Sequence, residues 1–192
     1  MIDINGDGYI DIYVSNSGDI KGDNKQNELF INNGDLTFTE KAKEYGLDDK
    51  GYSTHAAFFD YDRDGDLDCY LLNNSYKGGF RITNIGENQR PVRDSVGGDK
   101  LFKNENGVFQ DVSESSGIYG SIVGFGLGVT VGDVNNDDWM DIYVSNDFFE
   151  RDYLYINNKN GGFYEDLENR IRSISAASMG ADLADINNDG FA

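Results

Sequence analysis

The chain has 192 residues and a large acidic excess, with 35 Asp and Glu against 16 Lys and Arg and a formal net charge of −19. This charge argues against nucleic-acid phosphates and anionic membrane surfaces as partners. Its 12 Phe and 12 Tyr are too many aromatic residues for a disordered acidic chain, and 24 Gly with a single Pro indicate many tight turns. These numbers predict one folded domain over 1–192, with no segment that inserts into a membrane.

An acidic motif occurs four times along the chain. It begins at Asp3 (DINGDGYIDIYVSN), Asp60 (DYDRDGDLDCYLLNN), Asp133 (DVNNDDWMDIYVSN) and Asp185 (DINNDGFA). The shared pattern is Asp-x-Asp/Asn-x-Asp-Gly-x-apolar-Asp, and alternating apolar residues follow the first three copies. Such regular recurrence is typical of repeat architectures.

Each acidic motif has the same neighbours, and these are typical of strands. A run of small and apolar residues precedes the later motifs, as in THAAFFDYD, GFGLGVTVGD and SMGADLAD. Hairpins with Asn and Gly at the turn are predicted at 27–40, 99–112 and 152–167. Helix is expected at most as a turn near 166–175.

One repeat therefore contains four short antiparallel strands, and the predicted fold is all-β. Repeats of this kind and length are typical of a β-propeller with four-stranded blades. Complete blades are expected at roughly 52–113 and 118–167, with partial blades on either side. The chain is thus predicted to hold about three blades' worth of strands of an incomplete propeller.

The spacing of oxygen-bearing residues within each motif predicts calcium binding. In a tight loop, positions 1, 3, 5 and 9 can direct side chains inward while position 7 offers its backbone carbonyl, and Ca²⁺ takes about six to eight such oxygens. The candidate ligands of the four loops are Asp3, Asn5, Asp7, Tyr9 and Asp11; Asp60, Asp62, Asp64, Asp66 and Asp68; Asp133, Asn135, Asp137, Trp139 and Asp141; and Asp185, Asn187, Asp189 and Phe191. A solvated turn without a cation is the alternative for any single loop, but the recurrence in phase favours the cation.

Further positions of the motif carry structural expectations. Position 6 must turn sharply and is Gly in three loops, whereas the third loop has Asp138 there. Position 8 is apolar in every copy and is expected to pin the loop to a core; its residues are Ile10, Leu67, Met140 and Ala192. Because the second loop carries the most carboxylates, it is expected to bind a cation most tightly, followed by the first, the third and the fourth.

Two other calcium motifs are excluded by the residues. An EF-hand needs an acidic residue at position 12 and flanking helices, but position 12 is Val14, Leu71 and Val144 and the flanks are predicted strands. Cysteine-rich calcium repeats need disulfides, and Cys69 is the only cysteine.

These motifs resemble the FG-GAP or VCBS-type calcium-binding repeat, the blade of integrin α-subunit heads. The segments NELFINNGDLTFTEKAKEYGL, THAAFFDYDRDGDLD and GFGLGVTVGDVNNDDWMDIYVSNDFFERDYLYINN are most similar to secreted bacterial relatives of cartilage acidic protein, which commonly carry an ASPIC/UnbV domain. The resemblance covers essentially the whole chain. It implies a secreted or cell-surface propeller that binds calcium for structure and a further ligand for function.

The ends of the chain suggest a part of a longer protein. The first acidic loop has no predicted strand before it, and the last has none after it. An internal fragment of a longer reading frame is therefore expected. The start of the chain shows no signal peptide, which the parent of a secreted protein would carry.

The expected function is non-enzymatic binding of a protein or a glycan. The face opposite the acidic loops gathers 17–26, 75–98 and 147–152, and loops on a rigid scaffold are where binding residues usually lie. The candidate residues on that face are Lys77, Arg81, Arg90, Arg93, Phe148 and Phe149, with a solvated insertion and packing between blades as the alternatives.

Catalysis is the second hypothesis. No Ser or Cys has a nucleophile-elbow context, and the only histidine, His55, is predicted to be a hydrogen-bonded residue of an inner strand. Part of a secreted, lyase-like polysaccharide-degrading enzyme remains the alternative function.

Overall fold

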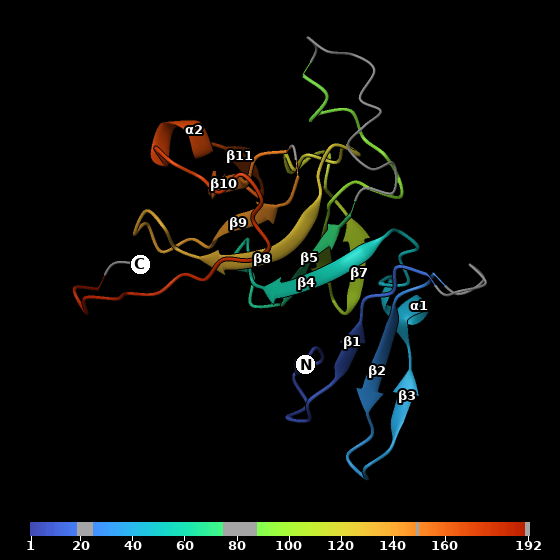
Figure 1. The fold of residues 1–192 in the computed structure, drawn as a ribbon. Coiled ribbons are helices and arrows are strands. Elements are labelled where there is room, and N and C mark those ends of the chain that lie inside the picture. The colour runs from blue at the N-terminus through green and yellow to red at the C-terminus, as the bar shows by residue number, and fades with distance from the viewer. Residues whose placement is uncertain (19–24, 75–87, 149, 191–192) are drawn as a thin grey trace.

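The computed structural model describes residues 1–18, 25–74, 88–148 and 150–190 (Figure 1). Three antiparallel sheets contain nearly all of its regular structure, which confirms the all-β prediction. The strands of the first sheet are β1 (Ile12–Val14), β2 (Glu28–Asn32) and β3 (Phe38–Glu40). Those of the second are β4 (Ser53–Phe59), β5 (Asp68–Asn73), β6 (Lys100–Glu105) and β7 (Val108–Asp111). Those of the third are β8 (Gly126–Gly132), β9 (Asp141–Asn146), β10 (Tyr153–Asn157) and β11 (Phe163–Glu165).

Two single-turn helices follow the hairpins of the first and third sheets. The helix α2 (Leu167–Arg170) lies within the expected turn near 166–175, whereas α1 (Ala42–Tyr45) was not expected. Four residues are too few to show a helical period. Gly46 ends α1 in the left-handed region, with φ of 76°. Within the described ranges, neither helix has the length or apolar character needed to cross a membrane.

Each sheet is a meander in which consecutive strands pair. The order is β4-β5-β6-β7 in the second sheet and β8-β9-β10-β11 in the third. The acidic motifs join β4 to β5 and β8 to β9, and the predicted hairpins form the last two strands of each sheet. The four-strand unit predicted from the repeats is therefore present in two complete copies among the described residues.

The first strands of neighbouring sheets lie side by side. The Thr54 hydroxyl donates to the Gly126 carbonyl at 3.0 Å, and the Val129 amide donates to His55 Nδ1 at 3.5 Å. The run before the fourth loop lies beside β8 in the same way (Figure 1), because the Thr130 hydroxyl donates to the Ala181 carbonyl at 2.7 Å. His55 lies on β4 and accepts the hydrogen bond from the Val129 amide, whereas the expectation that it is not a general base stays a prediction.

Each face of the second sheet contributes to a cluster of buried residues. On one face, Tyr70 and Leu72 pack in a cluster with residues of the third sheet. On the other, Cys69 and Leu71 pack with residues of the first sheet, such as Leu29. The sheets are thus stacked in sequence order around β5, whose six residues are all buried.

A buried polar arrangement recurs at the strand ends opposite the acidic loops. Asp99 accepts hydrogen bonds from the Asn73 amide and the Tyr70 hydroxyl, both at 2.9 Å. Asp152 makes the same two contacts in the third sheet, with the Asn146 amide at 2.8 Å and the Tyr143 hydroxyl at 2.6 Å. In the first sheet Asn27 takes this place, and its Nδ2 donates to the Tyr13 hydroxyl at 3.0 Å.

The buried carboxyl group of Asp99 predicts a stability that depends on pH. Burial raises its pKa to about 7, against the lowering effect of the Asn73 and Tyr70 hydrogen bonds and the Arg93 charge. Because the folded state then binds more protons than the unfolded state, whose pKa is about 3.9, this contribution to stability should fall as the pH rises from about 4 to about 7.

The Asp99→Asn variant should lose that dependence, since Asn27 shows that an amide fits this arrangement. Relative to the parent chain, the variant should gain free energy of unfolding between pH 4.5 and pH 8 in urea titrations. Glu114→Gln, which alters an exposed carboxylate, is the control. Parallel stability curves for the Asp99 variant and the parent would contradict this prediction.

Candidate metal centre

The acidic loops share a coiled backbone with two left-handed residues. At position 6, the predicted sharp turn is confirmed in all four copies, with φ of 88° at Gly8, 97° at Gly65, 67° at Asp138 and 90° at Gly190. Asp138 adopts the conformation without glycine, which Asp tolerates better than most residues. Position 4 is also left-handed, with φ of 70° at Gly6, 63° at Arg63, 56° at Asn136 and 59° at Asn188. This second turn was not predicted, although Gly and Asn occupy it in three loops.

The first aspartate of each loop holds the turn together. In every copy, one of its carboxylate oxygens accepts a hydrogen bond from the position 6 amide. The donor–acceptor pairs and their distances are Gly8 and Asp3 (2.9 Å), Gly65 and Asp60 (3.1 Å), Asp138 and Asp133 (2.7 Å), and Gly190 and Asp185 (2.7 Å). In the first, third and fourth loops the other oxygen accepts the position 5 amide. In the second loop no donor in the described chain reaches the other oxygen, Asp60 Oδ1.

The position 9 aspartates are buried anchors. Asp11, Asp68 and Asp141 have no exposed surface. In each case one oxygen accepts the position 2 amide of the same loop, and the other accepts an amide from the first strand of the hairpin that follows, which is β2, β6 or β10. For Asp68 these donors are Tyr61 at 3.1 Å and Asn104 at 2.9 Å. The loop is therefore fixed to the hairpin through backbone hydrogen bonds.

The sequence pattern did not indicate a role for three asparagines, one on the first strand of each hairpin. Asn32, Asn104 and Asn157 each donate Nδ2 to the position 8 carbonyl of their loop, at 3.1, 3.1 and 3.3 Å. The Asn157 side chain also donates to the Tyr61 carbonyl at 2.8 Å and so connects the second and third loops. The available signal was an Asn at the same place in FINN, FKNE and YINN.

The expectation that position 8 pins each loop to the core is wrong. Ile10 and Met140 are exposed, and Leu67 is only half-buried. Position 2 takes this role instead in the first two loops, where Ile4 and Tyr61 are buried. Of the position 8 residues, Ala192 lies outside the described residues.

The second loop concentrates unpaired carboxylate oxygens. Asp60, Asp62 and Asp68 each place one oxygen within 4.8 Å of the others. Asp60 Oδ1 and Asp62 Oδ1 are buried and have no hydrogen-bond partner among the described residues. Burial also raises the pKa of Asp68 to about 7, opposed by its two amide hydrogen bonds and reinforced by the charges of Asp62 and Asp64. Two buried anionic oxygens without donors are the arrangement that a bound cation would satisfy.

The other loops differ in exposure. In the third loop Asn135 Oδ1 is likewise buried without a partner in the described chain. In the first loop Asn5 and Asp7 are exposed, and in the fourth Asp185, Asn187 and Asp189 are exposed. Phe191 lies outside the described residues, and the carbonyl ligands at Tyr9, Asp66 and Trp139 stay predictions.

The face opposite the acidic loops is described only in part. Lys77, Arg81 and Phe149 lie outside the described residues. The Arg93 guanidinium donates to the Ile118 and Asp99 backbone carbonyls at 2.9 and 3.1 Å, and these contacts hold neighbouring loops together. Arg90 pairs with Glu150 at 2.7 Å, and Phe148 packs edge-on against Phe125 with a centroid distance of 4.6 Å.

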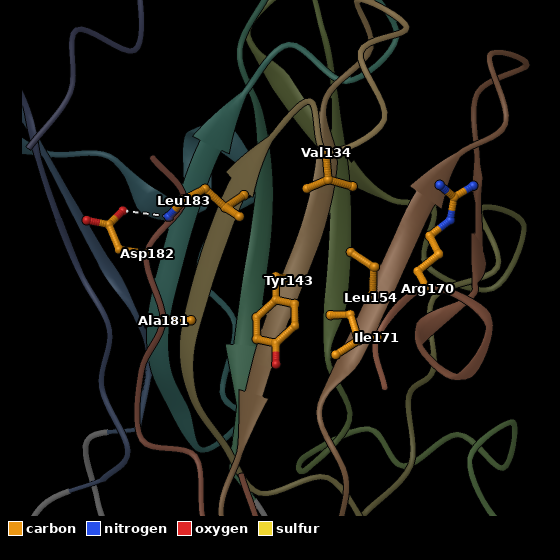
Figure 2. Close-up of a pocket in the computed structure, with 8 residues that line it drawn as sticks. All are labelled: Val134, Tyr143, Leu154, Arg170, Ile171, Ala181, Asp182 and Leu183. Carbon is orange, nitrogen blue, oxygen red and sulfur yellow. Dashed lines mark hydrogen bonds between the residues drawn. The ribbon is translucent and has the colours of Figure 1, made fainter. Parts of the chain in front are cut away.

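A cavity of about 500 Å³ opens on the outer face of the third sheet (Figure 2). Tyr143, Leu154 and Ile171 line it from one side and Leu183 from the other. In the second sheet, the residue aligned with Tyr143 is Tyr70, which is buried against the third sheet. The cavity therefore has the character of a sheet-packing surface rather than of a ligand pocket.

Comparison with protein families agrees with the loops and the sheets. The model of the FG-GAP-like repeat matches residues 3–71 and 133–192. The chain belongs to the FG-GAP-like repeat family. A comparison with curated proteins finds no match.

Proposed function

We propose that the chain is a calcium-binding portion of a secreted or cell-surface β-propeller whose role is to bind a protein or a glycan without catalysis. The observation that carries the calcium assignment is the pair of buried, donor-free oxygens Asp60 Oδ1 and Asp62 Oδ1 beside Asp68. The membership of the FG-GAP-like repeat family and the stacked antiparallel sheets support the propeller.

The residues of the second loop fit a hard divalent cation. Asp60, Asp62 and Asp68 would hold it, with Asp64 and the Asp66 carbonyl as further candidate ligands. Bound Ca²⁺ would neutralise the clustered carboxylates and cross-link positions of the loop. Calcium is favoured over Mg²⁺ because it accepts more ligands and less regular geometry, which suits a donor set of carboxylates, amides and carbonyls.

Calorimetric titration tests the site. The full chain should bind Ca²⁺ in preference to Mg²⁺, and Asp62→Asn should weaken binding at the second loop about tenfold because a carboxylate ligand becomes a neutral amide. Asp66→Asn is the matched control, since it removes the same charge from the same loop without changing a predicted side-chain ligand. Equal losses in the two variants would show a general charge effect, and no heat of binding in the parent would exclude the site.

The partner assignment rests on the acidic surface and on the loops opposite the acidic motifs. A strongly acidic protein suits cations, basic proteins or neutral glycans. Glycan-array binding with calcium present and with chelator present tests the proposal: binding that requires calcium supports it. Conversion of a polysaccharide to unsaturated products would instead indicate a lyase.

A further inference from the structure

Lys103 forms an ion pair inside the second acidic loop. Its Nζ lies 2.5 Å from Asp62 Oδ2 and 3.5 Å from Asp64 Oδ2. The side chains of Lys103 and Asp62 are 26% and 12% exposed, so water and salt screen this pair less than a surface pair. The two aspartates occupy positions 3 and 5, which are candidate cation ligands.

The other two sheets show that the fold does not require a positively charged side chain at the strand position of Lys103. Lys103 precedes Asn104 on β6 as Ile31 precedes Asn32 on β2 and Ile156 precedes Asn157 on β10. Both isoleucines are buried. An apolar side chain therefore fits the position, and among the three described sheets only the second has a lysine at this strand position.

The lysine accompanies a change in the loop itself. Position 3 is neutral in the first and third loops, as Asn5 and Asn135, but is charged in the second, as Asp62. The second repeat thus has an Asp–Lys ion pair where its neighbours have Asn and Ile. The positive charge of Lys103 thus balances the negative charge that Asp62 adds relative to the Asn of the other loops. The third loop also has a lysine, Lys159 at 3.1 Å from Asp137, but this side chain comes from the hairpin turn and is 46% exposed.

We propose that Lys103 is a built-in counter-cation that sets the affinity of the second loop for a divalent cation, an inference that rests on the proposed function. In the empty loop, the ammonium stabilises Asp62 against repulsion from the neighbouring carboxylates. When a divalent cation binds, the same ammonium repels it, although Asp62 Oδ1 is left available as a ligand. The affinity of the second loop for a divalent cation is therefore lower than its number of carboxylates alone predicts, and it does not exceed the affinity of the other loops by the expected margin.

Site-specific NMR titration tests this role in the full chain. The Gly65 amide donates to Asp60 and the Gly8 amide to Asp3, so each signal reports on its own loop. With CaCl₂, Lys103→Ile should lower the half-saturating concentration at Gly65 about tenfold and leave that at Gly8 unchanged. Lys103→Arg keeps the charge and should match the parent at both signals. The double variant Asp62→Asn, Lys103→Ile restores the Asn–Ile pair of the other repeats and should return Gly65 close to the parent value.

Melting in chelator gives a second measurement without any cation. Lys103→Ile should melt below the double variant, because only the single variant leaves Asp62 charged and unpaired while both contain the same isoleucine. Equal half-saturation at Gly65 in Lys103→Ile and the parent, with binding intact, would overturn the role of Lys103 and leave the proposed function standing. Gly8 and Gly65 signals that do not respond to calcium in any variant would overturn the proposed function and this inference with it.

Discussion

Calcium added to the chelated protein should raise its melting temperature by about 5–10 °C for each site that it fills. A site at about 100 times its dissociation constant adds roughly 2.7 kcal/mol to the free energy of unfolding, and about 1 kcal/mol corresponds to 2–4 °C for a chain of this size. The physical reason is that the proposed site consists of carboxylates gathered only in the folded state, such as Asp60, Asp62 and Asp68, so a cation would bind the folded chain in preference to the unfolded one. Differential scanning calorimetry in chelator and at increasing calcium measures the shift.

Two controls separate this effect from general screening. Sodium chloride of equal ionic strength should shift the melting temperature less than calcium does, since screening is not site-specific. Asp60→Asn should remove part of the calcium-dependent shift. A melting temperature that is the same in chelator and in calcium would mean that the acidic loops are solvated turns.

Replacing Asp141 with Ala should destabilise the protein by about 2–4 kcal/mol even in chelator. The Val134 and Asn157 amides donate to its two oxygens at 3.1 and 2.9 Å, and both would lose their acceptor. Burial raises the pKa of Asp141, so loss of a buried charge offsets part of this cost. Urea unfolding of the parent and the variant in chelator measures the difference.

Asp137→Ala in the same loop is the matched control. Asp137 accepts the Trp139 amide at 3.0 Å and pairs with Lys159 near the surface, and such contacts contribute about 1 kcal/mol or less. The two variants remove the same charge from one loop. Equal destabilisation by both would contradict the anchoring role of Asp141.

The sequence was sufficient for the features that repeat locally. Glycines such as Gly8 and Gly65 mark the left-handed turn because only a few residue types tolerate that conformation. The hairpins and the strands after the first three loops follow from alternation and turn residues, and they are present at the expected places.

The features that were missed depend on contacts between distant segments. The expectation for position 8 failed at Ile10 because apolar character does not tell which side of a loop faces the sheets. Asn104 and Lys103 reach a loop more than thirty residues earlier in the chain, and only the strand pairing brings them there. The pairing of Asp62 with Lys103 likewise becomes visible only once β5 and β6 are in register.

The buried position 9 aspartates have an evolutionary consequence. Because Asp11, Asp68 and Asp141 each accept two backbone amides, they fix each loop to its sheet without a contribution from the side chains at positions 3 and 5. A copy of the repeat can therefore lose or gain carboxylates at positions 3 and 5 by single mutations while its strands stay connected. The proposed affinity for a cation can therefore differ from one repeat to the next, and position 3 already differs, with Asp62 in the second loop and Asn135 in the third.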